Sequence, residues 1–219
     1  MSTSATATGA THAPAEATDQ RGVERPHEGK GERTRQAVLE AAIAHFAAVG
    51  FRGASVPAIA RDVRVSPSAV YAYFSSKTEL FEEAVDADVA GLISDALPEV
   101  LAGRFDRDFP GVFRRLLASL DQHPLARRVI DGQEGTGAER LAVLPAEVQV
   151  QRGLAQALRK GQADGTVRLD IDPELMAAGL EAVVIALLIA LLQTGGLADS
   201  SQARGAIAVL EASIRPPTP

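Results

Sequence analysis

The stretch VSPSAVYAYFSSKTEL, residues 65–80, contains both tyrosines of the chain. Aromatic residues are rare elsewhere: the 219 residues include nine, and six of these lie between Phe46 and Phe81. Two serines, Ser66 and Ser76, frame the aromatic group. Serine is a favoured helix N-cap because its hydroxyl accepts a hydrogen bond from a backbone N–H of the first turn. The stretch therefore predicts two helix starts around a small aromatic cluster.

The spacing around the two serines indicates which helices follow them. Pro67 comes directly after Ser66, and proline is favoured at the first helical position, which predicts a short helix over residues 67–74. Ser76 and Glu79 have the spacing of a capping box, in which each side chain bonds a backbone N–H at the helix start. A longer helix is therefore expected to begin directly after Ser76.

Two more helices are expected before this stretch. Apolar residues recur at helical spacing from Glu32 onward and stop before Gly50, which predicts a helix that ends there. Ser55 then opens a short helix that ends near Arg64. Two short helices joined by a turn of about three residues form a helix-turn-helix motif, here residues 55–74, whose second helix can enter the major groove of DNA.

The two sides of the helix at residues 67–74 differ in the size of their residues. Val70 and Phe74 lie four positions apart and are expected to point into the core, whereas the opposite side centres on Ser68 and Ala72. Small residues let the backbone approach base edges, and tyrosine hydroxyls and lysine suit phosphate oxygens. We therefore expect DNA to be contacted by Ser66, Pro67, Ser68, Ala69, Tyr71, Ala72, Tyr73 and Lys77. The competing interpretation is that the tyrosines are ordinary half-buried packing residues.

The charge distribution restricts where a polyanion can bind. The whole chain carries a net charge of −6. Residues 31–80 carry six Lys and Arg against four Asp and Glu, whereas residues 1–30 carry three against four and residues 81–219 thirteen against twenty. Only the middle segment is basic, so it is the part of the chain that suits DNA.

The order of these features resembles the N-terminal domain of the TetR family of bacterial transcriptional regulators. The similar segment runs from Thr34 to Val85, TRQAVLEAAIAHFAAVGFRGASVPAIARDVRVSPSAVYAYFSSKTELFEEAV, and contains the specific pattern YxYFxSKxxL. Arg64 stands in the turn where the family usually has Gly. At another position where the family contacts DNA, this chain has Val56 and Pro57, whose side chains cannot donate a hydrogen bond.

The resemblance implies an all-α fold with two domains. An N-terminal three-helix helix-turn-helix DNA-binding domain, residues 31–80, is joined to a larger helical ligand-binding and dimerisation domain, residues 81–219. Residues 1–30 are rich in Ala, Thr, Gly, Pro and Glu without periodic apolar positions, and are expected to form a disordered arm. No segment has a strand pattern, which agrees with a helical fold.

The last two expected helices, about residues 173–192 and 201–214, form the predicted dimer interface. The resemblance implies that they build a four-helix bundle with a second copy of the chain, and their apolar residues agree with it. The residues expected at the interface are Leu180, Val184, Leu187, Leu191, Ile207, Leu210 and Ile214. The competing interpretation is that both are core helices of a monomer.

The resemblance also implies a small-molecule effector of unknown identity. Apolar side chains from the middle of the chain could line a cavity, with a histidine or a glutamine as polar anchor. The candidates are Phe105, Phe109, Phe113, Leu117, His123, Val143 and Gln149. No cofactor is expected, and no metal site either, because the chain has no Cys and its four His lie far apart.

The sequence predicts a soluble, cytoplasmic protein without a membrane partner. The N-terminus lacks the basic region and apolar core of a secretory signal. The longest apolar run, residues 182–192, has 11 residues, whereas a membrane span needs about 20.

These observations predict a ligand-responsive transcriptional regulator. The expected form is a homodimeric repressor that binds a palindromic operator in double-stranded DNA and is released by a small-molecule effector. The alternative is a helical adaptor that binds a protein partner and has lost its DNA affinity. An enzyme is not expected, because the sequence contains no phosphate-binding loop, GxSxG or HExxH motif.

Overall fold

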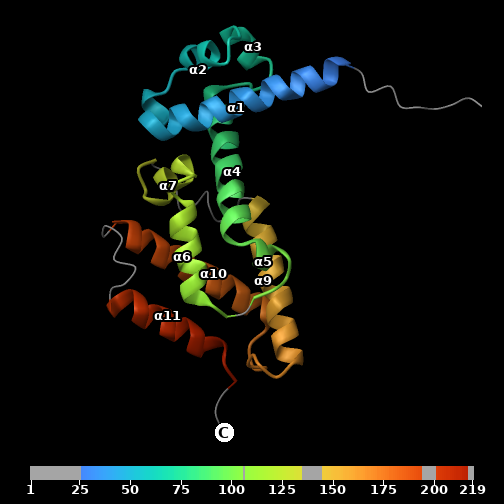
Figure 1. Ribbon diagram of the computed structural model, residues 1–219, viewed down its shortest axis with the longest axis vertical. Helices are drawn as coiled ribbons and strands as arrows, with labels where there is room; N and C mark the ends of the chain where they lie inside the picture. Colours follow the sequence, from blue (N-terminus) through green and yellow to red (C-terminus); the bar gives the residue numbers. More distant parts are fainter. Residues whose placement is uncertain (1–25, 106, 135–144, 194–200, 217–219) are drawn as a thin grey trace, which may run out of the picture.

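The computed structural model describes residues 26–105, 107–134, 145–193 and 201–216, and within these ranges every regular element is an α-helix (Figure 1). The predicted all-α fold is confirmed. The helices are α1 (Pro26–Gly53), α2 (Val56–Asp62), α3 (Pro67–Tyr71), α4 (Lys77–Ala96), α5 (Pro98–Leu101), α6 (Phe109–Ser119), α7 (Pro124–Ile130), α9 (Pro145–Ala163), α10 (Pro173–Gln193) and α11 (Ser201–Ile214).

Helices α1, α2 and α3 pack with the first turns of α4 into a small N-terminal unit, at the top of Figure 1. Its core contains five side chains that are at most 1% exposed: Phe46, Ile59, Val70, Phe74 and Leu80. The sequence correctly predicted that Val70 and Phe74 point inward. Burying one side chain of this size contributes about 1.5–3 kcal/mol. This packing stabilises α2 and α3, since isolated helices of this length are unstable in water.

Helix α4 belongs to both halves of the molecule. Leu80 and Phe81 in its first turns are buried in the N-terminal unit, and Val89, Leu92 and Ile93 further along are buried in the larger body. The helix packs against α1 near one end and against α6, α7 and α9 beyond it. One continuous helix therefore connects the two halves, descending from α1 in Figure 1.

The body is a bundle in which α9 packs along α10 and α5, while α11 lies beside α10 and α6. Among the helices in the described ranges, α10 alone is long and apolar enough to cross a membrane by length and composition. Only 28% of its most apolar stretch is buried within the chain. Most residues of this stretch are therefore half-buried or exposed within the chain.

A buried carboxylate connects α4 to α7. Asp88 of α4 is 6% exposed, and its Oδ2 accepts hydrogen bonds from the backbone N–H groups of Leu125 and Ala126, at 2.9 and 2.8 Å. Its Oδ1 lies 3.0 Å from Nδ1 of His123. The carboxylate thus satisfies N–H groups at the start of α7 that have no partner inside the helix.

Three helix boundaries differ from the sequence expectation. The helix expected to end before Gly50 continues to Gly53, with a kink at Gly50, whose φ and ψ are not helical. Helix α1 begins at Pro26, so residues 26–30 are helical and not part of the expected disordered arm, while residues 1–25 lie outside the described ranges. Proline is favoured in the first helical turn, which fits this start. Helix α3 ends at Tyr71 because the N–H groups of Tyr73 and Phe74 both bond the carbonyl of Val70, which tightens the chain into a turn.

Gly50 lies in α1, beside the side chains of Arg128 in α7 and Glu134 after it. It has a φ of 71°, and a Cβ at this position would stand 2.5 Å from Oε1 of Glu134 and 2.8 Å from Nη2 of Arg128. Gly50→Ala is therefore expected to lower the free energy of unfolding by about 2 kcal/mol or more, because backbone strain and a close contact combine. Urea unfolding measures this loss.

Gly132→Ala is the matched control for this prediction. Gly132 has a φ of +74°, but a Cβ there would meet nothing within 4 Å. Only the backbone strain applies, so the expected loss is about 1 kcal/mol. If both variants lose the same free energy of unfolding, the close contact of residue 50 with the Arg128–Glu134 pair contributes nothing to the loss.

Candidate functional site

The turn between α2 and α3 closes with a Schellman motif. The N–H of Val65 donates to the carbonyl of Ala60 at 2.9 Å, and the N–H of Arg64 donates to the carbonyl of Arg61 at 3.1 Å. Arg64 has a φ of 58°, the left-handed conformation that favours glycine. The turn therefore keeps this geometry without the expected glycine, at some cost in backbone strain.

Serine side chains cap α3 and α4, as the sequence predicts. Oγ of Ser66 accepts from the N–H of Ala69 at 3.1 Å, and Oγ of Ser76 accepts from the N–H of Glu79 at 3.0 Å. The capping box is altered, since the Glu79 carboxylate accepts from the Ser75 N–H at 2.6 Å and from the Ser75 hydroxyl. The bond from that hydroxyl, followed by the bond from the N–H, lowers the pKa of Glu79. Both caps fix the orientation of the segment between them.

The outer side of the motif is small and mostly uncharged. Of the residues expected to contact DNA, Ser66, Pro67, Ser68, Tyr71 and Ala72 are exposed, and Ala69, Tyr73 and Lys77 are half-buried. The side chain of Tyr71 is 49% exposed, which makes it the most prominent large group on α3.

Tyr73 and Lys77 also have partners inside the protein. Tyr73 packs against the core, with its hydroxyl close to Gly31 of α1. Nζ of Lys77 lies 4.7 Å from the ring centroid of Phe51, which is a cation–π contact. Tyr71 is therefore the more exposed of the two tyrosines.

The positive charge that faces solvent is smaller than the sequence count suggests. Arg35 forms an ion pair with Glu83 of α4, and its guanidinium lies 5.0 Å from the ring centroid of Phe74. Arg35 thus helps to hold α1 against α4. The exposed cations among the described residues of the N-terminal unit are Lys30, Arg33, Arg52, Arg61 and Arg64.

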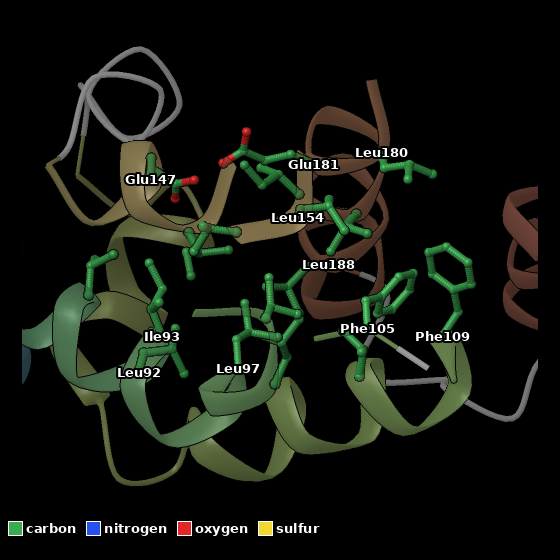
Figure 2. A pocket seen from close by; sticks show the side chains of 18 residues that line it. Leu92, Ile93, Leu97, Phe105, Phe109, Glu147, Leu154, Leu180, Glu181 and Leu188 are labelled. Carbon is green, nitrogen blue, oxygen red and sulfur yellow. The ribbon is translucent and has the colours of Figure 1, made fainter. Parts of the chain in front are cut away.

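A second candidate site is a pocket in the body, between α4, α6, α9 and α10 (Figure 2). Its volume is about 100 Å³. Of the 18 residues that line it, all are apolar except Glu147 and Glu181. The rings of Phe105 and Phe109 meet edge-to-face at one side, with centroids 5.0 Å apart.

Phe105 and Phe109 are the two residues of the expected ligand site that line this pocket. The other expected residues within the described ranges, Phe113, Leu117, His123 and Gln149, do not line it, and Val143 lies outside those ranges. His123 has a structural role, since Nδ1 lies 3.0 Å from Oδ1 of Asp88 and Nε2 lies 3.2 Å from Oδ2 of Asp95. It therefore links α4 to the start of α7 instead of reaching the pocket.

Two carboxyl groups face each other at one end of the pocket. In Figure 2, Glu147 of α9 and Glu181 of α10 point toward one another above the apolar side chains. Oε2 of Glu181 accepts a hydrogen bond from Nε2 of Gln151 at 3.2 Å. Oε1 of Glu181 is buried and has no hydrogen-bond partner among the described residues.

The environment of the acid pair favours a proton on Glu147. Burial first, and then the neighbouring Glu181 carboxyl, raise the pKa of Glu147 to about 9. Glu147 is therefore protonated at neutral pH, and at most one of the two carboxyls carries a charge. Among the residues that the structure describes, no group of three His, Asp or Glu lies together as a metal site would require.

The outer surface of α10 and α11 is apolar. Leu175 and Val183 of α10 and Val209 of α11 are 68%, 46% and 69% exposed. Together with Gly179 they line a groove between the two helices. This exposed face has the composition of an interface with another protein.

The most exposed residues of α10 and α11 are not the ones that the sequence analysis named. Leu180, Leu191, Leu210 and Ile214 are buried inside the protomer, and Val184, Leu187 and Ile207 are half-buried. Leu180 and Leu210 also line the groove between the two helices, and the assignment of the named residues to a dimer interface stays a prediction. The side chains of the four buried residues fill the core of the chain, and a helix that is apolar on all sides does not reveal which side faces inward.

Comparison with known proteins agrees with this geometry. The family model for bacterial regulatory proteins of the tetR family matches residues 38–84. The HTH-type transcriptional repressor SCO4008 of Streptomyces coelicolor is 31% identical over 186 residues, which cover 80% of this chain and 92% of that protein. The chain belongs to the TetR family of transcriptional regulators.

Solved structures of TetR-family proteins share the fold over most of their length. The match to NemR of E. coli, in its reduced form, covers 85% of this chain and 100% of the NemR chain, with a TM-score of 0.61 and 19% identity. The regulator SCO4942 of Streptomyces coelicolor covers 83% and 98%, with a TM-score of 0.56 and 25% identity. RolR in complex with resorcinol covers 85% and 90%, with a TM-score of 0.57 and 19% identity.

Proposed function

We propose that this TetR-family regulator is a homodimeric repressor that binds a palindromic operator and releases it when a small molecule fills the pocket of the body. Residues 31–80 would read DNA, and residues 81–219 would dimerise and bind the effector in the cytoplasm. The observation that carries the proposal is the exposed small-residue side of α3, held outward by Val70 and Phe74. The curated relative is itself named a transcriptional repressor.

The DNA contact is assigned to the exposed side of α3 and to the groups beside it. Ser68 and Ala72 leave room for the backbone to approach base edges, while Tyr71 projects far enough to reach a phosphate or a base. The exposed arginines of the N-terminal unit, Arg33, Arg52, Arg61 and Arg64, add positive charge around it. Phosphate contacts of this kind supply most of the affinity, and sequence is read by α3.

The dimer contact is assigned to the exposed face of α10 and α11. Leu175, Val183 and Val209 would pack against the same face of a second copy, since a two-fold axis pairs one surface with itself. An uncovered apolar groove between two helices fits two helices of a partner, which gives a four-helix bundle. The bundle would also bury the apolar surface of α10 that the chain leaves uncovered.

The response to a ligand is assigned to α4. The pocket is lined by Val89, Leu92 and Ile93 of this helix, whose first turns are part of the N-terminal unit. A ligand that favours a different position of α4 would change the separation of the two α3 helices, which must lie about 34 Å apart on DNA. The ligand can change the DNA affinity only by as much as its own affinity differs between the two positions of α4.

Tyr71→Ala is expected to weaken operator binding at least about tenfold, which corresponds to about 1.4 kcal/mol, because it removes the large exposed group of α3. Binding to the DNA upstream of the protein's own gene is measured by gel shift at several salt concentrations. The affinity of the unaltered protein should fall steeply as salt rises, since binding releases counterions.

Gln149→Ala is the control, because Gln149 is exposed on α9 away from α3. It should leave operator affinity unchanged. If Tyr71→Ala and Gln149→Ala behave alike, the DNA surface is assigned wrongly. If the unaltered protein binds DNA at no salt concentration, the alternative of a helical adaptor for a protein partner replaces the repressor proposal.

The dimer contact has its own test. The double variant Val183→Glu/Val209→Glu is expected to be a monomer at concentrations where the unaltered protein is a dimer, because it places four charges in the apolar bundle. Sedimentation velocity measures the two species. Val148→Glu is the control, since Val148 is 44% exposed on α9, away from the groove. An unchanged dimer in the double variant would contradict the assigned face.

A further inference from the structure

We propose that the pocket of the body binds a lipophilic amine in its cationic form, with an aromatic or aliphatic body among the apolar side chains and the ammonium group at the Glu147–Glu181 pair. The inference rests on the proposed function only in that this pocket is the effector site. It adds the chemical class of the effector, which the family and the relatives named above do not determine.

The first argument is the unused acceptor at the acid pair. Oε1 of Glu181 is buried without a hydrogen-bond partner among the described residues, although Oε2 is bonded to Gln151. Leaving a buried polar atom unpaired is costly, and for a carboxylate the cost is greater than for a neutral group. A ligand that brings an N–H donor to this atom would remove the cost.

The second argument is charge. Glu147 and Glu181 are the only titratable side chains that line the pocket, and none of its described lining residues is a cation. Two neighbouring acids in an apolar cavity without a cationic side chain repel each other when both are ionised. A proton or another cation at the pair removes this repulsion. Without a ligand, a proton on Glu147 lowers the charge of the pair, as the raised pKa of this carboxyl indicates. An ammonium group can take over the same role.

The third argument is the rest of the cavity. All other lining residues are apolar, and Phe105 and Phe109 meet edge-to-face on the side away from the acids (Figure 2). A cavity of about 150 Å³ in another protein binds benzene. This pocket of about 100 Å³ is smaller, so it accepts a ligand with one ring only if the side chains that line it shift. A larger ligand would have to move the surrounding helices.

The same features disfavour other ligand classes. An anion would place a second negative charge beside the acid pair and would find no cation in the lining. A neutral alcohol can donate to Oε1 of Glu181 but cannot balance its charge. A charge-assisted hydrogen bond is about twice as strong as a neutral one, which favours the amine over the alcohol.

The test compares three ligands of nearly equal size: phenethylamine, phenethyl alcohol and phenylacetate. Their binding to the full-length protein at pH 7 is measured by ligand-observed NMR titration. The amine is expected to bind at least about tenfold more tightly than the alcohol, a difference of about 1.4 kcal/mol, and phenylacetate more weakly than both. Equal affinities for the amine and the alcohol, or tighter binding of phenylacetate, would overturn the proposal.

Variants of the acid pair locate the effect. In Glu147→Gln/Glu181→Gln the preference for the amine over the alcohol should disappear, because the pocket keeps its shape and hydrogen-bonding groups but loses its charge. Glu174→Gln is the matched control: it removes a negative charge from α10 outside the pocket, where Glu174 pairs with Arg159, and should keep the preference. A preference that survives in the double variant would show that the acids do not bind the amine. The comparison of the three ligands with the unaltered protein decides the question even if the double variant does not fold.

A gel shift on the same preparations separates this inference from the proposed function. If the operator is bound in a salt-dependent manner but the amine has no preference over the alcohol, the ligand class is wrong and the repressor proposal stands. If the amine binds with the expected preference while no operator is bound, the ligand class stands and the repressor proposal fails.

Discussion

The hydrophobic packing of α4 is the constraint on which both candidate sites depend. Leu80 in its first turn is fully buried in the core that also holds Val70 and Phe74, and these two residues turn the opposite side of α3 outward. Leu92 and Ile93, farther along the same helix, line the pocket of the body. A helix transmits displacement along its axis because its hydrogen-bonded turns deform little. The surface proposed to contact DNA and the wall of the pocket therefore belong to one stiff element.

Polar contacts determine how α4 is held between its neighbours. Asp88 fixes it to the start of α7, and Arg35 fixes α1 to it through Glu83. The carboxylate of Glu134, which follows α7, accepts from the N–H of Phe51 at 3.2 Å. The first contact joins α4 to α7, the second joins α1 to α4, and the third joins α1 to the segment after α7. A few specific bonds therefore define the junction between the N-terminal unit and the body. Loss of one would leave a polar group without its partner at the junction.

The sequence predicted the parts of the fold that local rules determine. The bounds expected for α11, residues 201–214, agree with the structure, since amphipathic spacing marks such a helix. Ser66 and Ser76 cap their helices as their hydroxyls and neighbours suggest. The inward direction of Val70 and Phe74 followed from their four-residue spacing. Each of these features depends on residues a few positions apart.

Features that depend on distant residues were not accessible in this way. Glu147 and Glu181 lie on different helices, and no local pattern indicates that their carboxyls meet at the end of one pocket. Asp88 caps a helix that starts 36 positions later. The most exposed residues of α10 were not predicted, because the helix is apolar on all sides and only its packing against α9 and α11 shows which side remains exposed.

The central claim is that filling the pocket and binding the operator oppose each other through α4, and a cavity-filling variant tests it without knowledge of the effector. Val150→Phe places a ring in the pocket, whereas Val148→Phe places the same ring on the exposed side of the same helix. We expect Val150→Phe to weaken operator binding at least about tenfold while thermal unfolding shows that it remains folded, and Val148→Phe to bind like the unaltered protein. Unchanged operator affinity in a folded Val150→Phe variant would contradict the coupling between pocket and DNA surface.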